Sequence, residues 1–221
     1  MRNGTLRAAP RTQSSIAVAG SDAAGWALVN ASPDILTQLR VHSDLQPARA
    51  PRDSGLAGIV LVDAQIDHTA GLLMLRESLG PLAIWCTDAV YADLTGGNPL
   101  FKVLGHYCGV ERCRMVTSGE EFSLPGVPGV RWQAIAVAGK PAPYSPHRDA
   151  AVGGDNVALV ISDVDFFEPG TLETLRATCA EQEVPILATG AQCESAEPDQ
   201  LRKPFVADDL VGKVEALVPA H

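Results

Sequence analysis

The stretch LVDAQIDHTAGLL, Leu61 to Leu73, decides how the chain folds and where its chemistry lies. It continues the apolar run GIVLV, and a short apolar run between turn-forming residues predicts a buried strand. A helical stripe of leucines follows at positions 72, 75 and 79. Between strand and helix lie four polar residues: Asp63, Gln65, Asp67 and His68. The stretch therefore predicts a strand that brings polar groups to its end.

These four residues have two interpretations. On a strand, positions 63, 65 and 67 point to one side, because side chains alternate, and His68 can turn onto the following loop. Two carboxylates, an amide and an imidazole there could hold one cation, and a carboxylate–imidazole pair with one distant ligand suits Fe(II) or Zn. Alternatively, Asp67 caps a helix that begins at Thr69, and His68 lies on the surface. Spacing alone leaves both interpretations open.

Composition and charge limit the classes of protein to which the chain can belong. Its 221 residues are 46% hydrophobic and 19% charged, with a net charge of −9 and no long basic run. Nucleic-acid and anionic-membrane partners need clustered Lys and Arg, so we expect neither. The first residues lack the apolar core of a secretory signal, and no apolar run reaches about 18 residues. The five cysteines fit no zinc spacing, and we expect reduced thiols in a cytoplasmic protein.

The remaining pattern alternates strands with helices, which predicts an α/β fold with parallel strands. Ser32 and Thr87 are placed to cap helices, with Pro33 at a first helical position. Strands are expected at 14–20, 25–32, 56–62, 82–86, 130–137, 156–162 and 184–190, and helices at 32–39, 87–94, 171–182 and 206–218.

Two further groups of residues could carry chemistry. The loop PYSPHRD, residues 143–149, contains Arg148, which could clamp a carboxylate, and His147, which could be a ligand or a general acid/base. Asp155 and Asn156 precede a buried strand, where Asp155 could add a carboxylate. Each of these has an ordinary alternative as a solvated loop or a turn.

Three residues near the C-terminus form the second group. Asp163 ends one strand, Thr189 ends the next, and Lys203 precedes a proline. In that order they could gather around a phosphoryl group, with Asp163 as the acceptor and the other two as oxygen partners.

Residues 2 to about 161 resemble the coenzyme PQQ synthesis protein B family, a branch of the metallo-β-lactamase fold. The segments that carry the resemblance are GTLRAAPRTQSSIAV, LVNASPDI, GIVLVDAQIDHTAGLLMLRE, IWCT, APYSPHRD and NVALVI. The resemblance implies a metallo-β-lactamase-like sheet with outer helices, a partial αββα sandwich. It also implies a role in making pyrroloquinoline quinone (PQQ), as an iron-dependent hydroxylase acting on the tyrosine of a Glu-Tyr precursor. The alternative is a carrier module that binds and transports PQQ or its precursor.

The resemblance also implies roles for individual residues. The usual signature H-x-H-x-D-H is occupied here by Asp63, Gln65, Asp67 and His68, so Asp67 and His68 carry over as catalytic metal ligands. The third ligand is open between Asp155, His147, Asp163 and Asp165, and Fe(II) or Zn would be weakly held. If the chain is a binding module, Arg11, Lys140 and Arg148 could offset the carboxylates of PQQ or its acidic precursor, a small-molecule or short-peptide-derived substrate. The substrate-binding residues are expected to be Asp63, Gln65, Tyr144, Ser145, His147, Arg148, Asn30 and Asp34.

The chain also departs from this family. Members are longer, open with a glycine-rich strand and a cysteine cluster for zinc, and supply a further Asp and a late His from their second half. After Ile161 this chain instead resembles the back half of a two-component receiver domain, without an acidic pair for Mg²⁺. We therefore expect two regions, 1–161 and 162–221, as in a fusion or chimera. The second is a receiver-like segment that could serve in docking, and an open half-sandwich would favour a homodimer.

Overall fold

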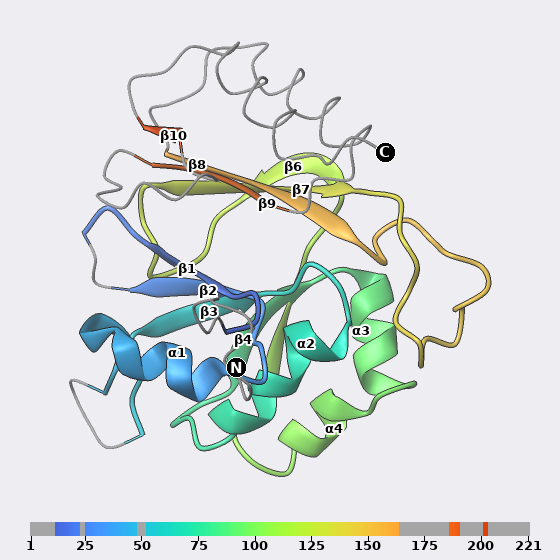
Figure 1. Cartoon of the computed structure of the whole chain (residues 1–221), viewed down its shortest axis with the longest axis horizontal. Helices are drawn as coiled ribbons and strands as arrows, with labels where there is room; N and C mark the ends of the chain where they lie inside the picture. Colours follow the sequence, from blue (N-terminus) through green and yellow to red (C-terminus); the bar gives the residue numbers. More distant parts are fainter. Residues whose placement is uncertain (1–11, 23–24, 48–51, 164–185, 191–200, 203–221) are drawn as a thin grey trace, which may run out of the picture.

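Two five-stranded sheets pack face to face, and the helices cover the outer side of the first sheet (Figure 1). The computed structural model describes residues 12–22, 25–47, 52–163, 186–190 and 201–202. Helices outside one sheet and a second sheet against its other face confirm the predicted α/β, metallo-β-lactamase-like class.

The first sheet has the order β1-β2-β3-β4-β5. Strands β1 and β2 are antiparallel, and β2 to β5 are parallel. Four of its strands lie where or close to where the sequence predicted them, whereas β5 was not predicted. The bounds are β1 Ile16–Ala19, β2 Trp26–Val29, β3 Leu56–Val60, β4 Leu82–Cys86 and β5 Val110–Arg114.

The second sheet has the order β10-β9-β8-β7-β6. Strands β6, β7 and β8 are antiparallel, whereas β9 and β10 add to them in parallel. The region boundary expected at residue 161 falls inside β8, which pairs with β7 as far as Asp163. The bounds are β6 Ser118–Phe122, β7 Val130–Ala136, β8 Val157–Asp163, β9 Ile186–Gly190 and β10 Leu201–Arg202.

The helices are short, and their ends follow local chemistry. The predicted cap at Thr87 is confirmed, because its hydroxyl accepts from Val90 N at 3.2 Å. The cap predicted at Ser32 is wrong, because its hydroxyl donates to Gln38 Oε1 instead. The bounds are α1 Ile35–Val41, η1 Ser43–Leu45, α2 Ile66–Thr69, η2 Ala70–Leu75, α3 Asp88–Thr95 and α4 Leu100–Leu104.

Residues 61–73, LVDAQIDHTAGLL, are called the key stretch below. The helical stripe of leucines predicted to begin within it is shorter than expected. Helix α2 passes directly into the 3₁₀ helix η2, which ends at Leu75, and Leu79 is 69% exposed. Gly80 and Pro81 disfavour helical backbone at their own positions, which limits how far any helix here could extend.

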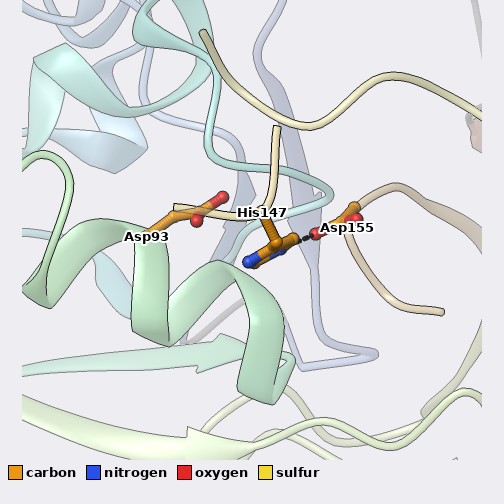
Figure 2. Close-up of side chains that lie close together, drawn as sticks. All are labelled: Asp93, His147 and Asp155. Atoms are coloured by element: carbon orange, nitrogen blue, oxygen red, sulfur yellow. Dashed lines mark hydrogen bonds and ion pairs between the residues drawn. The ribbon is translucent and has the colours of Figure 1, made fainter. Parts of the chain in front are cut away.

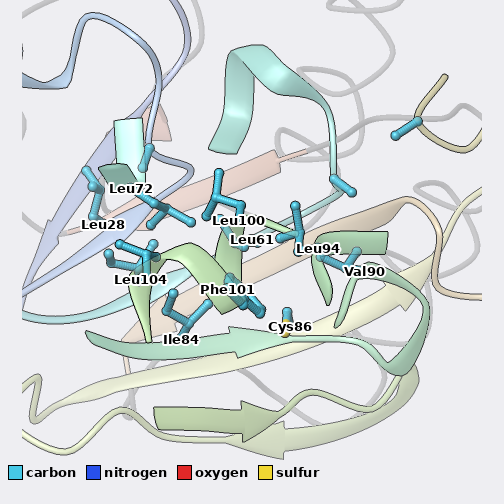
Figure 3. Close-up of a cluster of buried hydrophobic side chains, with 14 of the residues drawn as sticks. Leu28, Leu61, Leu72, Ile84, Cys86, Val90, Leu94, Leu100, Phe101 and Leu104 are labelled. Atoms are coloured by element: carbon cyan, nitrogen blue, oxygen red, sulfur yellow. The ribbon is translucent and has the colours of Figure 1, made fainter. Parts of the chain in front are cut away.

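Side-chain alternation along the strands fills two separate cores. In β3 and the residues after it, Ile59 and Leu61 face the helices, whereas Val60 and Val62 face the second sheet. Both faces are buried, which explains why GIVLV is apolar without a break. The helix-side core is drawn in Figure 3 and includes Leu28, Leu61, Leu72, Ile84, Cys86, Val90, Leu94, Leu100, Phe101 and Leu104.

The core between the two sheets closes the sandwich. Val29 and Val60 of the first sheet share this core with Trp132 and Leu159 of the second. The apolar face of the first sheet is therefore covered within the chain. Because of this, the reason given for a homodimer, an exposed sheet face, does not hold for the described residues, although the oligomeric state stays a prediction.

The receiver-like residues are described only in part. Asp163 is the last residue of β8, and Thr189 lies in β9, where it pairs with Leu201 of β10. Lys203, Arg11 and Asp165 lie outside the described residues, so the phosphoryl site stays a prediction.

Two expectations from the sequence concerned the thiols and membrane-spanning segments. Cys86, Cys108 and Cys113 are free thiols, and burial raises the pKa of Cys86 to about 11. Among the residues that the structure describes, no helix has the length and apolar character that crossing a bilayer requires. The cytoplasmic location stays a prediction.

Candidate functional site

The polar residues of the key stretch lie after strand β3 and are not part of it. Strand β3 ends at Val60, Gln65 is the N-cap of α2, and Asp67 and His68 lie within that helix. The expected alternation of positions 63, 65 and 67 on a strand is therefore wrong. The cause is local: Asp63 Oδ1 accepts from Gln65 N at 2.8 Å, a turn that an Asp side chain makes readily. The alternative, a helix capped by Asp67, is also wrong.

The turn brings Asp63 and His68 together. His68 Nδ1 lies 2.8 Å from Asp63 Oδ1, and its Nε2 lies 3.9 Å from Asp67 Oδ2. A carboxylate on one ring nitrogen fixes the tautomer and directs the other nitrogen toward a metal, as in many metal sites. The Asp67 side chain is 59% exposed and can adjust to share an ion with that nitrogen. The two residues therefore fit a metal as a ligand pair, and Asp63 acts as the positioning group.

The same contact gives the metal-free protein a pH dependence. The pKa of His68 is raised above its ordinary 6.5, chiefly by the hydrogen bond to Asp63 and against the effect of burial. A raised folded-state pKa means stability that is complete below the unfolded pKa and is lost as the pH rises through the folded pKa.

We expect the stability advantage of wild type over Asp63→Asn to shrink as the pH rises from 6 through the folded pKa of His68. Urea denaturation of both metal-free proteins across that range measures it. Asp67→Asn is the control and should keep most of the pH dependence, because the Asp67 charge contributes least to the shift. Identical pH profiles for wild type and Asp63→Asn would contradict the assignment.

The loop after β2 is hydrogen-bonded to helix α2. Asn30 has a φ of 59° and is 2% exposed, and its Oδ1 accepts from Val62 N. Ala31 N donates to His68 O at 2.7 Å, which ties the loop to α2. Asp34 Oδ2 accepts from Gln13 N. Both residues expected to bind substrate are thus engaged within the protein, and their substrate role stays a prediction.

The loop of residues 140–156 lies against the key stretch. The Tyr144 hydroxyl donates to Ala64 O, next to Asp63, and burial raises the pKa of Tyr144. Arg148 donates to Pro141 O within the loop. The predicted substrate-side loop and the predicted metal pair are therefore neighbours in space, although about 80 residues separate them in sequence. Arg148 as a clamp for substrate carboxylates stays a prediction.

A second group of ligand-type side chains lies where this loop meets α3 (Figure 2). His147 Nε2 is 2.6 Å from Asp155 Oδ1, and ligand atoms of Asp93, His147 and Asp155 lie within 4.8 Å of one another. Asp93 comes from α3 and was not singled out from the sequence. Its signal was an aspartate beside Leu94 on a helix face that also buries Val90.

From the sequence, Asp155 and His147 were candidates for the third ligand of Asp67 and His68, but in the structure both lie with Asp93. Among the described residues, the group of three candidate ligands within 4.8 Å is Asp93, His147 and Asp155, and it does not contain Asp67 or His68. Asp155 makes its hydrogen bonds to His147 and to Val152 N. Whether Asp155 also completes a site with Asp67 and His68 stays a prediction.

A separate cavity of about 400 Å³ lies at the other end of the first sheet. It is lined by parts of α1 and η2 and by the first residues of β3 and β4. None of the predicted site residues lines it.

Comparison with known proteins identifies the superfamily of the chain. A family model described as beta-lactamase superfamily domain matches residues 25–171. Coenzyme PQQ synthesis protein B of Azoarcus sp. (strain BH72) is 53% identical over 175 residues, which are 77% of this chain and 57% of that protein. The protein of the same name from Methylobacillus flagellatus (strain ATCC 51484 / DSM 6875 / VKM B-1610 / KT) is 48% identical over 199 residues, covering 87% and 63%.

The fold is also similar to that of a solved structure of the same family. The crystal structure of Zn(2+)-bound PqqB from Methylobacterium extorquens is 28% identical to this chain, with a TM-score of 0.59 over 73% of this chain and 52% of that one. The chain thus spans about three fifths of the length of the curated relatives that it matches.

Proposed function

The chain belongs to the beta-lactamase superfamily, and from that premise we propose that it takes part in the biosynthesis of PQQ as a metal-dependent oxidising enzyme. The observation that carries the proposal is identity of about one half to proteins named coenzyme PQQ synthesis protein B, over more than three quarters of the chain. The substrate is the tyrosine side chain of a Glu-Tyr precursor, and the reaction is hydroxylation of its ring.

The residues of the key stretch support the metal dependence. His68 presents Nε2 beside Asp67 while Asp63 holds its other nitrogen, which is the arrangement of a metal-binding histidine with its positioning carboxylate. Imidazole and carboxylate donors suit Fe(II) as well as Zn. An iron ion at this pair would supply the redox chemistry by which O₂ and a two-electron reductant hydroxylate a ring. Asp67 and His68 would hold it, and a third ligand is required.

The neighbouring loop supports a substrate site at the same place. Tyr144 is half-buried and contacts the key stretch at Ala64, and the next residue, Ser145, is buried. A loop that is hydrogen-bonded to the residues beside a metal pair can exclude water from the bound ring and orient it. Lys140 is exposed at the start of the loop and is suited to offset a substrate carboxylate.

Product analysis tests the proposal. We expect the iron-loaded protein, given O₂, ascorbate and a peptide that contains the Glu and Tyr, to add one oxygen atom to the tyrosine. Mass spectrometry with ¹⁸O₂ measures the addition. The matched control is the same peptide with Tyr→Phe, and zinc-loaded protein controls for the redox step. Protein that binds iron but gives no labelled product would contradict the hydroxylase.

One observation favours a second candidate, a binding or carrier module for PQQ or its precursor. Of the three metal ligands predicted from the family, Asp67 and His68 lie together, whereas Asp155 is hydrogen-bonded to His147. A site with two ligands can bind an acidic molecule without turning it over. Calorimetric titration of the metal-free protein with PQQ distinguishes the candidates, since the carrier binds without metal and the hydroxylase needs metal for its substrate to react.

A further inference from the structure

The cluster of Asp93, His147 and Asp155 is assembled from two parts of the chain. Asp93 comes from the inner face of α3, whereas His147 and Asp155 come from the loop that leads into β8. The imidazole lies between the two carboxylates (Figure 2). Thr87 strengthens this junction, because its hydroxyl donates to Gly154 O at 2.6 Å. Helix and loop are therefore held close enough for all three side chains to serve one ligand.

The cluster carries more negative charge than its protein partners offset. Asp93 is 1% exposed and Asp155 is 4% exposed. The only ion pair that the structure describes for them joins Asp155 to His147, and the nearby Arg148 is used by Pro141 O. One imidazole can neutralise one carboxylate at most, and a buried carboxylate without a counter-charge is costly.

A second observation points to a ligand in this place. Asp93 Oδ1 is buried and has no hydrogen-bond partner within the part of the chain that the structure describes. The carboxyl group is directed toward His147 and Asp155 (Figure 2). Buried acceptors are almost always satisfied, so an unpartnered carboxylate oxygen that faces two other ligand atoms indicates a missing cation or proton.

We propose that Asp93, His147 and Asp155 bind one divalent transition-metal cation, such as Zn²⁺ or Mn²⁺, at a site separate from the Asp67–His68 pair. Two carboxylates and an imidazole suit such borderline cations better than Ca²⁺, which prefers six to eight oxygens. Ligands bonded at about 2.1 Å to one tetrahedral ion lie about 3.4 Å apart, so separations of up to 4.8 Å must close by about 1 Å, while the 2.6 Å contact of His147 with Asp155 must open. The ion replaces the hydrogen bond between His147 and Asp155.

An ion here would fasten the loop of residues 140–156 to α3. The same loop carries Tyr144, which contacts Ala64 beside the proposed active-site metal. The second ion therefore sets the position of the substrate-side loop and takes no part in the oxidation itself. In this assignment Asp155 belongs to the second site, and the third ligand of the Asp67–His68 pair comes from elsewhere.

Metal stoichiometry of the full chain tests the inference. Chelator-treated protein is titrated with Zn²⁺ by calorimetry and, in parallel, with Mn²⁺ by electron paramagnetic resonance. We expect two Zn²⁺ ions for wild type, one for Asp93→Asn and one for His68→Ala. Asp149→Asn removes an exposed carboxylate of the same loop and is the matched control, with two ions expected. His147→Gln repeats the Asp93 experiment should the helix variant fold poorly.

The outcomes separate this inference from the proposed function. Loss of one ion in Asp93→Asn but not in Asp149→Asn supports the second site, whatever His68→Ala does. If Asp93→Asn and His147→Gln bind as many ions as wild type with unchanged affinity, the site does not exist, and the cluster is satisfied by a proton. If His68→Ala keeps both ions, the metal pair of the proposed function fails while this inference stands.

Discussion

Replacing His68 by alanine is expected to weaken binding of Fe(II) or Zn(II) at the Asp67–His68 pair by more than about 100-fold, because loss of the positioning residues around a metal ligand alone costs about 10- to 100-fold. His68 is the nitrogen donor of the pair, and Asp63 fixes which ring nitrogen is available to the metal. After the substitution, Asp67 is left as a single exposed carboxylate, which holds a cation weakly.

Calorimetry or competition with a chromophoric chelator measures this affinity. His106→Ala is the control, because His106 is a solvent-exposed histidine on the turn after α4, outside the stretch that carries the site. Asp63→Asn should fall between wild type and His68→Ala, since it leaves the donor but frees its ring to rotate. An unchanged dissociation constant in His68→Ala would contradict the proposed metal site at the Asp67–His68 pair.

Replacing Trp132 by alanine is expected to destabilise the fold by about 4 kcal/mol, within the range for truncating a large buried aromatic side chain. Trp132 is fully buried between the two sheets and stacks on Phe122 with ring centroids 6.3 Å apart. Its indole N–H has no partner among the described residues, so the loss is one of packing and leaves no broken hydrogen bond.

Urea denaturation followed by circular dichroism measures the change in the free energy of unfolding. Leu79→Ala is the matched control, because Leu79 is an apolar side chain of the same chain that is 69% exposed, and we expect a change within about 0.5 kcal/mol. A loss under about 1 kcal/mol in Trp132→Ala would mean that the two sheets do not share one core.

The two proposed metal sites have a physical link in the loop of residues 140–156. Its hydroxyl contact from Tyr144 reaches the key stretch, and its His147 reaches toward Asp93 on α3. Metal bound at the second site would therefore be felt at the first as a change in loop position.

Local features of the sequence determined much of the fold. The unbroken apolar run GIVLV predicted a strand buried on both sides, because each alternate residue has a core of its own to fill. Thr87 before a short amphipathic segment predicted a helix start, because a hydroxyl in that position satisfies a free backbone N–H. The Asp67–His68 pair was predicted from the resemblance of several segments to a known family, whereas the spacing within its own segment left two interpretations open.

Tertiary structure decided the rest, and in each case the reason is a contact between distant residues or a competing local bond. Asp63 forms a turn, because its Oδ1 accepts from Gln65 N, and the helix that begins there brings His68 Nδ1 to the same oxygen. Asp93 met His147 and Asp155 only because α3 and a loop more than 50 residues later pack on the same edge. Spacing along a chain carries the period of a helix or strand, but not the distance between two segments that a core brings together.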